Sequence, residues 1–186
     1  MKVKPPLVSL MKNILLFSLL IIPTIGKSAF HLWDIAEIYS SDDGSVQFIE
    51  LVCDVNNQQF LSGHDLFADS DGNVVTFTFP SNSGSPTADK RLLIATASFA
   101  SLPGAVTPDF TLPDNFFNPT ATAIQINFGP NSHIVNFSGS DVPSDGMSSI
   151  DDNLVSAVNS PTNFAGDTGS IFVEPDFIFA SGFEAD

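Results

Sequence analysis

The sequence predicts an all-β protein, a sandwich of two sheets that follows an N-terminal signal peptide. Short runs rich in β-branched and aromatic residues alternate with clusters of Gly, Pro, Ser, Asn and Asp, which is typical of strands joined by turns. Beyond the first 28 residues, no helical periodicity continues for the length of an ordinary helix. The roughly seven or eight strands expected between residues 32 and 137 would suffice for a two-layer sandwich.

The signal peptide is predicted from the charge and hydropathy of residues 1–28. Three lysines precede an apolar run at residues 14–22, and Pro23 and small residues follow it. This run is shorter than the ~20 apolar residues that a membrane-spanning helix needs. We therefore expect a protein that starts at Met1 or Met11, is cleaved on export, and is secreted or periplasmic without a transmembrane anchor. A buried helix of the folded domain is the alternative interpretation.

The strands are expected in the following places. Seven runs have the composition of strands: residues 35–39, 46–53, 64–69, 73–79, 91–96, 122–128 and 133–137. The Ser-Asp-Gly sequence at 70–72 predicts a tight hairpin turn, because glycine adopts positive φ without steric cost. Residues 91–96 are apolar on both faces, which indicates a central strand.

The segments between these strands are predicted to be loops. Residues 81–89 are polar and contain Gly and Pro. Residues 97–118 contain three prolines, so we expect a long connection with one helical turn around 98–102. A Gly-Pro-Asn-Ser turn at 129–132 separates the last two strands.

The interior is predicted to be packed with phenylalanine. The chain has 18 Phe residues, one Tyr and one Trp. Phenylalanine needs no hydrogen-bond partner when it is buried, so a core role is expected. The alternative is a surface strip of aromatic rings that stacks on sugars, although such strips usually include Trp and Tyr.

The composition shifts after Ser138 towards Ser, Asp, Asn and Gly. We therefore expect a sandwich at residues 29–137 and a loosely packed acidic extension at 138–186. Three phenylalanines close to the C-terminus are too apolar for a purely solvated tail. They are expected to pack on the domain or to be recognised by another protein.

The charge of the chain limits its partners. Beyond residue 28 only Lys90 and Arg91 are basic, while all 21 acidic residues remain, so the mature chain has a net charge of −19. A nucleic acid would meet repulsion along its phosphate backbone and is excluded as a ligand. Anionic membrane surfaces are disfavoured for the same reason.

Cys53 is the single cysteine, so the chain has no intramolecular disulfide. It ends an apolar run, and we expect a buried, inert thiol. A reactive or intermolecular cysteine is the alternative.

Several short motifs occur in a characteristic order. They are Ile35-Ala36-Glu37-Ile38, Phe48-Ile49-Glu50-Leu51, Leu61-Ser62-Gly63, the strand from Leu66 to Asp69, the hairpin Asp71-Gly72, and Leu93-Ile94-Ala95-Thr96. In this order they resemble the lamin-tail domain of exported bacterial proteins over residues 32–137. The chain departs from that pattern at Ala36, where Asn is usual, and at Val52-Cys53, where a Tyr-Asn pair often follows. The resemblance implies an immunoglobulin-like accessory, tethering or binding module without catalytic residues. Separately, FIFASGFE at the C-terminus resembles the short I-F-x-x-G-F-E ends of many exported proteins of gammaproteobacteria.

Glu37 and Glu50 are the candidate acid and base of an enzyme. If they face each other in the sheet, they could act as the carboxylate pair of a glycoside hydrolase. The alternative is a structural role as edge or loop-capping glutamates. The three histidines lie far apart, and the sequence contains neither an H-E-x-x-H nor a G-x-S-x-G motif.

Asp69, Asp71 and Asn73 are the candidate ligands of a calcium ion. Calcium prefers oxygen ligands, and the D-x-D-G-N run resembles the start of a calcium loop, although the closing glutamate is missing. Hairpin-turn chemistry explains the same residues without a metal. Further acidic candidates are Asp42, Asp43 and the Asp151-Asp152 pair.

Together these observations favour a secreted or cell-surface, non-catalytic binding or structural module of a bacterial exported protein. Its partner would be a protein or a glycan of the cell envelope. No cofactor is expected other than the candidate calcium ion. The alternative is a small secreted hydrolase that uses Glu37 and Glu50.

Overall fold

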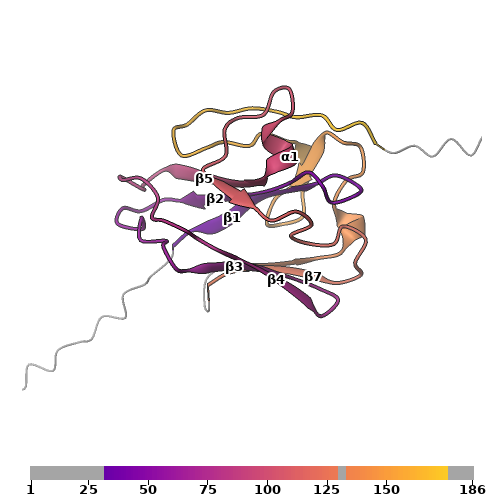
Figure 1. Ribbon diagram of the computed structural model, residues 1–186, viewed down its shortest axis with the longest axis horizontal. Coiled ribbons are helices and arrows are strands. Elements are labelled where there is room, and N and C mark those ends of the chain that lie inside the picture. The colour runs from indigo at the N-terminus through magenta and orange to yellow at the C-terminus, as the bar shows by residue number, and fades with distance from the viewer. Residues whose placement is uncertain (1–31, 130–132, 176–186) are drawn as a thin grey trace, which may run out of the picture.

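Two β-sheets stack face to face in the computed structural model, which describes residues 32–129 and 133–175 (Figure 1). The predicted all-β sandwich is confirmed. Within the described residues the only helices are α1 (Ala97–Ala100) and a 3₁₀ turn at Gly139–Asp141. No helix in this part of the chain is long and apolar enough to cross a membrane.

One sheet has six strands in the order β10-β9-β1-β2-β5-β6. Their bounds are β1 Asp34–Ser40, β2 Gln47–Cys53, β5 Lys90–Thr96, β6 Phe110–Leu112, β9 Ser148–Ile150 and β10 Ser156–Val158. Neighbouring strands are antiparallel except β5 and β6, which are parallel. β5 lies inside the sheet, as its apolar sequence predicted.

The other sheet is antiparallel, with the order β4-β3-β7-β8. Its strands are β3 Asp65–Ser70, β4 Asn73–Thr78, β7 Ile124–Phe128 and β8 Ile134–Phe137. Asp71 and Gly72 both have positive φ at the β3–β4 turn, as the Ser-Asp-Gly sequence predicted. All seven predicted strands are present, each within two residues of its expected bounds.

Three strands were not predicted, and each has only three residues. β6 lies within the expected connection 97–118, and β9 and β10 lie within the expected extension 138–186. β9 pairs with β1 through Ile150 and Ile38. The packed structure therefore does not end at residue 137, because pairing with β1 and burial of Ile150 hold the later residues on the sandwich. The C-terminal FIFASGFE sequence, like the signal peptide, lies outside the described residues.

Aromatic rings fill the space between the sheets, as predicted. The Phe79 ring lies 5.0 Å from that of Phe77, 5.1 Å from that of Phe110 and 5.6 Å from that of Phe128, each pair in an edge-to-face arrangement. Trp33 is fully buried, and its indole Nε1 donates to the carbonyl oxygen of Gln58 at 2.9 Å. The rings therefore join strands of both sheets.

A second apolar cluster covers the opposite face of the six-stranded sheet. It contains Tyr39, Val46, Phe48, Leu93, Ala95, Phe99 and Ile171. In Figure 1, α1 and the C-terminal chain lie over this face. Because both faces are covered, β2 and β5 are buried almost continuously instead of alternating between buried and exposed residues.

Cys53 is buried and makes no disulfide, as predicted. Its thiol donates to the carbonyl oxygen of Val55 at 3.2 Å. Burial raises the pKa of this thiol, which disfavours the reactive thiolate.

Candidate functional site

The two candidate glutamates lie directly opposite each other on neighbouring strands. Glu37 of β1 pairs with Glu50 of β2 in the regular register of these strands, and a β-bulge at Ala36 shifts the pairing only beyond Glu37. Because directly paired residues share a face, Glu37 and Glu50 project from the same side of the sheet. Both side chains are buried, with 8% of Glu37 and 0% of Glu50 exposed.

The C-terminal chain covers this pair. We call residues 159–173 the covering segment. The backbone N–H of Ser160 donates to Glu37 at 2.9 Å, and that of Thr162 donates to Glu50 at 2.6 Å. The two carboxylates therefore bind the backbone of a segment more than 100 residues away in the sequence.

A third carboxylate continues the pattern. The backbone N–H of Phe164 donates to Asp109 at 2.9 Å, and Asp109 also accepts from Leu93 N–H of β5 at 2.8 Å. Three alternate residues of the covering segment thus each donate to a carboxylate, and the three carboxylates come from three different parts of the chain. These bonds fix the path of the segment across the sheet.

Two side chains complete the surroundings of the glutamates. The Ser149 hydroxyl of β9 donates to Glu37 at 2.6 Å. The Arg91 guanidinium of β5 forms an ion pair with Glu50. Arg91, one of the few cationic side chains, therefore pairs with a carboxylate of the same chain.

Burial sets the protonation of Glu50. It raises the pKa of this carboxyl from 4.5 to about 7, against the opposing effects of the Thr162 N–H and Arg91, and the charge of Glu37 raises it further. Burial also raises the pKa of Asp109, despite the two N–H groups that it accepts. Near neutral pH, Glu50 is therefore divided between its charged and neutral forms.

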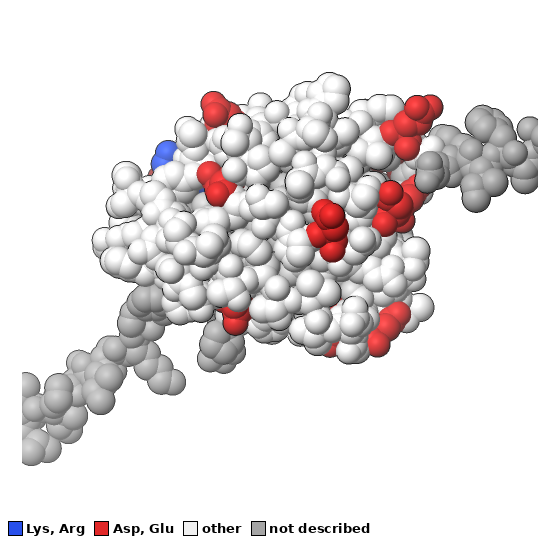
Figure 2. Space-filling view, viewed as in Figure 1, with Lys and Arg blue, Asp and Glu red and all other residues white. Residues whose placement is uncertain are grey.

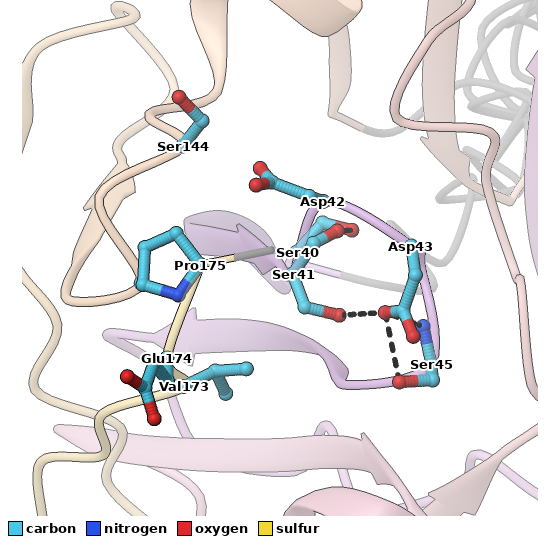
Figure 3. Close-up of a pocket in the computed structure, with 10 residues that line it drawn as sticks. Ser40, Ser41, Asp42, Asp43, Ser45, Ser144, Val173, Glu174 and Pro175 are labelled. Carbon is cyan, nitrogen blue, oxygen red and sulfur yellow. Dashed lines mark hydrogen bonds between the residues drawn. The ribbon is translucent and has the colours of Figure 1, made fainter. Parts of the chain in front are cut away.

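An acidic pocket of about 110 Å³ lies at the end of the same sheet, between the β1–β2 turn and the C-terminal chain (Figure 3). Asp42, Asp43 and Glu174 contribute carboxylates to its lining. Asp43 accepts from the hydroxyls of Ser41 at 2.6 Å and Ser45 at 2.8 Å, and chiefly the Ser41 bond lowers the pKa of Asp43. Asp43 therefore stabilises the turn, whereas Asp42 points towards the other wall in Figure 3.

The proposed calcium ligands serve the β3–β4 hairpin. Asp69 accepts from the Gly72 N–H at 2.7 Å. The Asp71 carboxylate accepts from the Thr122 N–H at 3.0 Å, the Thr122 hydroxyl at 2.8 Å and the Ala123 N–H at 2.9 Å. These bonds, chiefly that from Thr122 N–H, lower the pKa of Asp71. Over the described ranges, no group of three or more His, Cys, Asp or Glu residues is placed to hold a metal ion.

Other polar residues singled out from the sequence are dispersed. Asp151 accepts from the backbone N–H groups of Asn153 and Val155. His133 Nδ1 accepts from the Ile35 N–H at 2.9 Å, and its Nε2 lies 3.4 Å from Asp152. These side chains hold loops against the sandwich.

No protein-family model, curated protein or solved structure matches this chain. The lamin-tail resemblance therefore rests on its sequence motifs. Sequence reasoning found Glu37 and Glu50 but missed Asp109 and Glu174, which belong to no motif and come together only through the fold.

Asp71→Ala is expected to lower the melting temperature without any metal present, because three hydrogen bonds to the start of β7 are lost. Adding EDTA to the wild-type protein is expected to leave the melting temperature unchanged. Scanning calorimetry with and without EDTA measures both effects, with the exposed Asp114→Ala variant as a control. A fall in melting temperature on EDTA addition that calcium reverses would contradict the expectation and establish the calcium site.

Proposed function

We propose that the protein is an exported, non-catalytic binding or structural module that acts in a secreted form or at the cell surface. The signal-peptide pattern of residues 1–28 and the strong net negative charge support this role. Figure 2 illustrates the charge, with acidic side chains spread over one face and a small basic patch at its edge. The partner would be a protein or a glycan of the cell envelope, and the motif order suggests a lamin-tail-like domain.

One observation carries the non-catalytic part of this proposal. Glu37 and Glu50, the candidate acid and base, already accept hydrogen bonds from Ser160 and Thr162 beneath the covering segment. General acid–base catalysis requires a carboxyl group within hydrogen-bond reach of the substrate. In this arrangement the backbone of the protein occupies that position, so the pair serves to hold the segment.

Cell fractionation of the producing bacterium tests export. The protein is expected in the periplasm, at the cell surface or in the medium, with a new N-terminus near residue 29. Leu16→Arg interrupts the apolar run and should leave the precursor in the cytoplasm, whereas Ser9→Arg, which precedes the run, should not. An uncleaved wild-type protein in the cytoplasm would refute the proposal.

The hydrolase alternative is favoured by one observation, the pKa of about 7 at Glu50 beside a second carboxylate. It requires the covering segment to leave the pair. It predicts release of reducing ends from a polysaccharide and loss of this release in Glu50→Gln. The module proposal expects no release from either protein.

A further inference from the structure

The outer face of the four-stranded sheet contains a buried amide without a partner. Asn127 of β7 is 9% exposed, and its Oδ1 makes no hydrogen bond. Asparagine is disfavoured in strands, and a buried polar group without a partner is destabilising. This residue therefore weakens the fold at a position where an apolar side chain would strengthen it.

The neighbours of Asn127 form a row across the sheet. Phe67 of β3 pairs with Asn127 on one side and with Thr76 of β4 on the other, and Ile134 of β8 pairs with Asn127. Paired residues share a face, so all four side chains point outward, away from the Phe-rich core. Phe67 is half-buried and Ile134 is 44% exposed. The amide thus lies between two apolar side chains, and 9% of Asn127, but not its Oδ1, is exposed at the outer surface.

The adjacent row is polar except for the exposed Val74 of β4, which pairs with Asp69. Asp69 of β3 pairs with Gln125 of β7, which pairs with Asn136 of β8. The Gln125 amide donates to the Asn136 side chain at 2.9 Å, so these two side chains are held side by side. With strands ~4.8 Å apart, four strands span ~14 Å, which is wider than one sugar ring.

In Figure 1 this sheet lies on the side opposite α1 and the covering segment. No described element covers its outer face, where Val74, Thr76, Thr78 and Asn136 are exposed. This face therefore differs from the outer face of the six-stranded sheet, which is closed by its own apolar cluster.

We propose that this outer face, centred on Phe67 and Asn127, binds a neutral polysaccharide. A sugar ring offers an apolar C–H face to Phe67 and hydroxyl groups to Asn127, Gln125 and Asn136. A half-turn of the Asn127 amide exchanges its oxygen and nitrogen, so it can accept from or donate to a hydroxyl. The proposal rests on the proposed function and names the ligand class of that module.

The charge of the face selects among glycans. Asp65 and Asp69 lie on this face, and Lys90 and Arg91, the described Lys and Arg residues, belong to the other sheet. Anionic polysaccharides such as alginate would be repelled. A neutral chain avoids this repulsion, and its hydroxyls can donate to the carboxylates.

Affinity electrophoresis of the purified protein tests the proposal, with hydroxyethyl cellulose, dextran or xyloglucan in the gel. At least one is expected to retard the wild-type protein, and alginate is not. Asn127→Leu and Phe67→Thr should each weaken binding about tenfold, the effect of one lost hydrogen bond or stacking contact. Phe60→Thr removes an exposed ring elsewhere, 50% exposed in the wild type, and should bind normally.

Thermal melting separates a binding defect from misfolding. Asn127→Leu removes the unpaired amide, so its melting temperature should equal or exceed that of the wild type although binding is weakened. Lack of retardation by all three neutral polysaccharides would overturn the proposal, as would unchanged binding in both variants or retardation by alginate alone. If the protein is still exported and captured by envelope fractions, the proposed module function survives this failure.

Discussion

Replacing Phe79 by alanine is expected to lower the free energy of unfolding by about 3–5 kcal/mol, the usual cost of truncating a buried phenylalanine. The Phe79 ring is 1% exposed and contacts three other rings, those of Phe77 and Phe128 in the four-stranded sheet and that of Phe110 in the six-stranded sheet. The substitution therefore leaves a cavity between the two sheets.

Urea denaturation measures this loss as a lower midpoint at constant slope. Phe60→Ala provides the matched control, because the Phe60 ring is half exposed and its loss should change stability by no more than about 0.5 kcal/mol. Equal effects of the two substitutions would contradict the arrangement of the core.

The wild-type protein is expected to be more stable at pH 5 than at pH 8, and Glu50→Gln is expected to remove much of this difference. The pKa of Glu50 is raised from 4.5 to about 7 in the folded state. The folded state therefore binds a proton more tightly than the unfolded state does. The stability gained from this proton is fully present below pH 4.5 and is lost as the pH rises through 7. Its size is about 3 kcal/mol.

Urea denaturation at pH 5 and at pH 8 gives the difference in the free energy of unfolding between the two pH values for each protein. Glutamine keeps an oxygen that can accept from the Thr162 N–H but cannot titrate. The comparison therefore measures how proton binding at residue 50 changes the stability. The chain also has a large negative charge, and its self-repulsion in the folded state weakens as carboxylates are protonated. The stability of Glu50→Gln should therefore still fall with rising pH, but less than that of the wild type. An identical pH dependence in the two proteins would refute the assignment to Glu50.

The strands that could be predicted from the sequence are those whose own residues, or the turn beside them, have a recognisable pattern. Val75, Phe77 and Phe79 alternate with exposed threonines, and Asp71 and Gly72 favour the turn before them. β6, β9 and β10 have three residues each and are held by pairing with distant strands, so no local pattern reveals them. The Ser- and Asp-rich composition after residue 138 suggested solvation, but Asp145 and Asp151 use their carboxylates to bind turn backbone.

The candidate site could be predicted in part, because two of its carboxylates belong to strand motifs that the sequence shows. The strand motifs suggested that Glu37 and Glu50 would meet across a sheet, and the β1–β2 register places them opposite each other. Their cover was not predictable, because Ser160 and Thr162 bind through backbone N–H groups that nearly every residue has. Asn127 was also missed, since only the packed structure shows that its amide has no partner.

The position of the covering segment also affects the order in which the chain can fold during synthesis. Tyr39, Phe48 and Leu93 share an apolar cluster with Ile171, which is made well after all three of them. Until then, the outer surface of the six-stranded sheet remains open to water, with Glu37 and Glu50 lacking the N–H groups that they accept from it. A nascent chain therefore cannot complete the native packing of this sheet until the covering segment has been made.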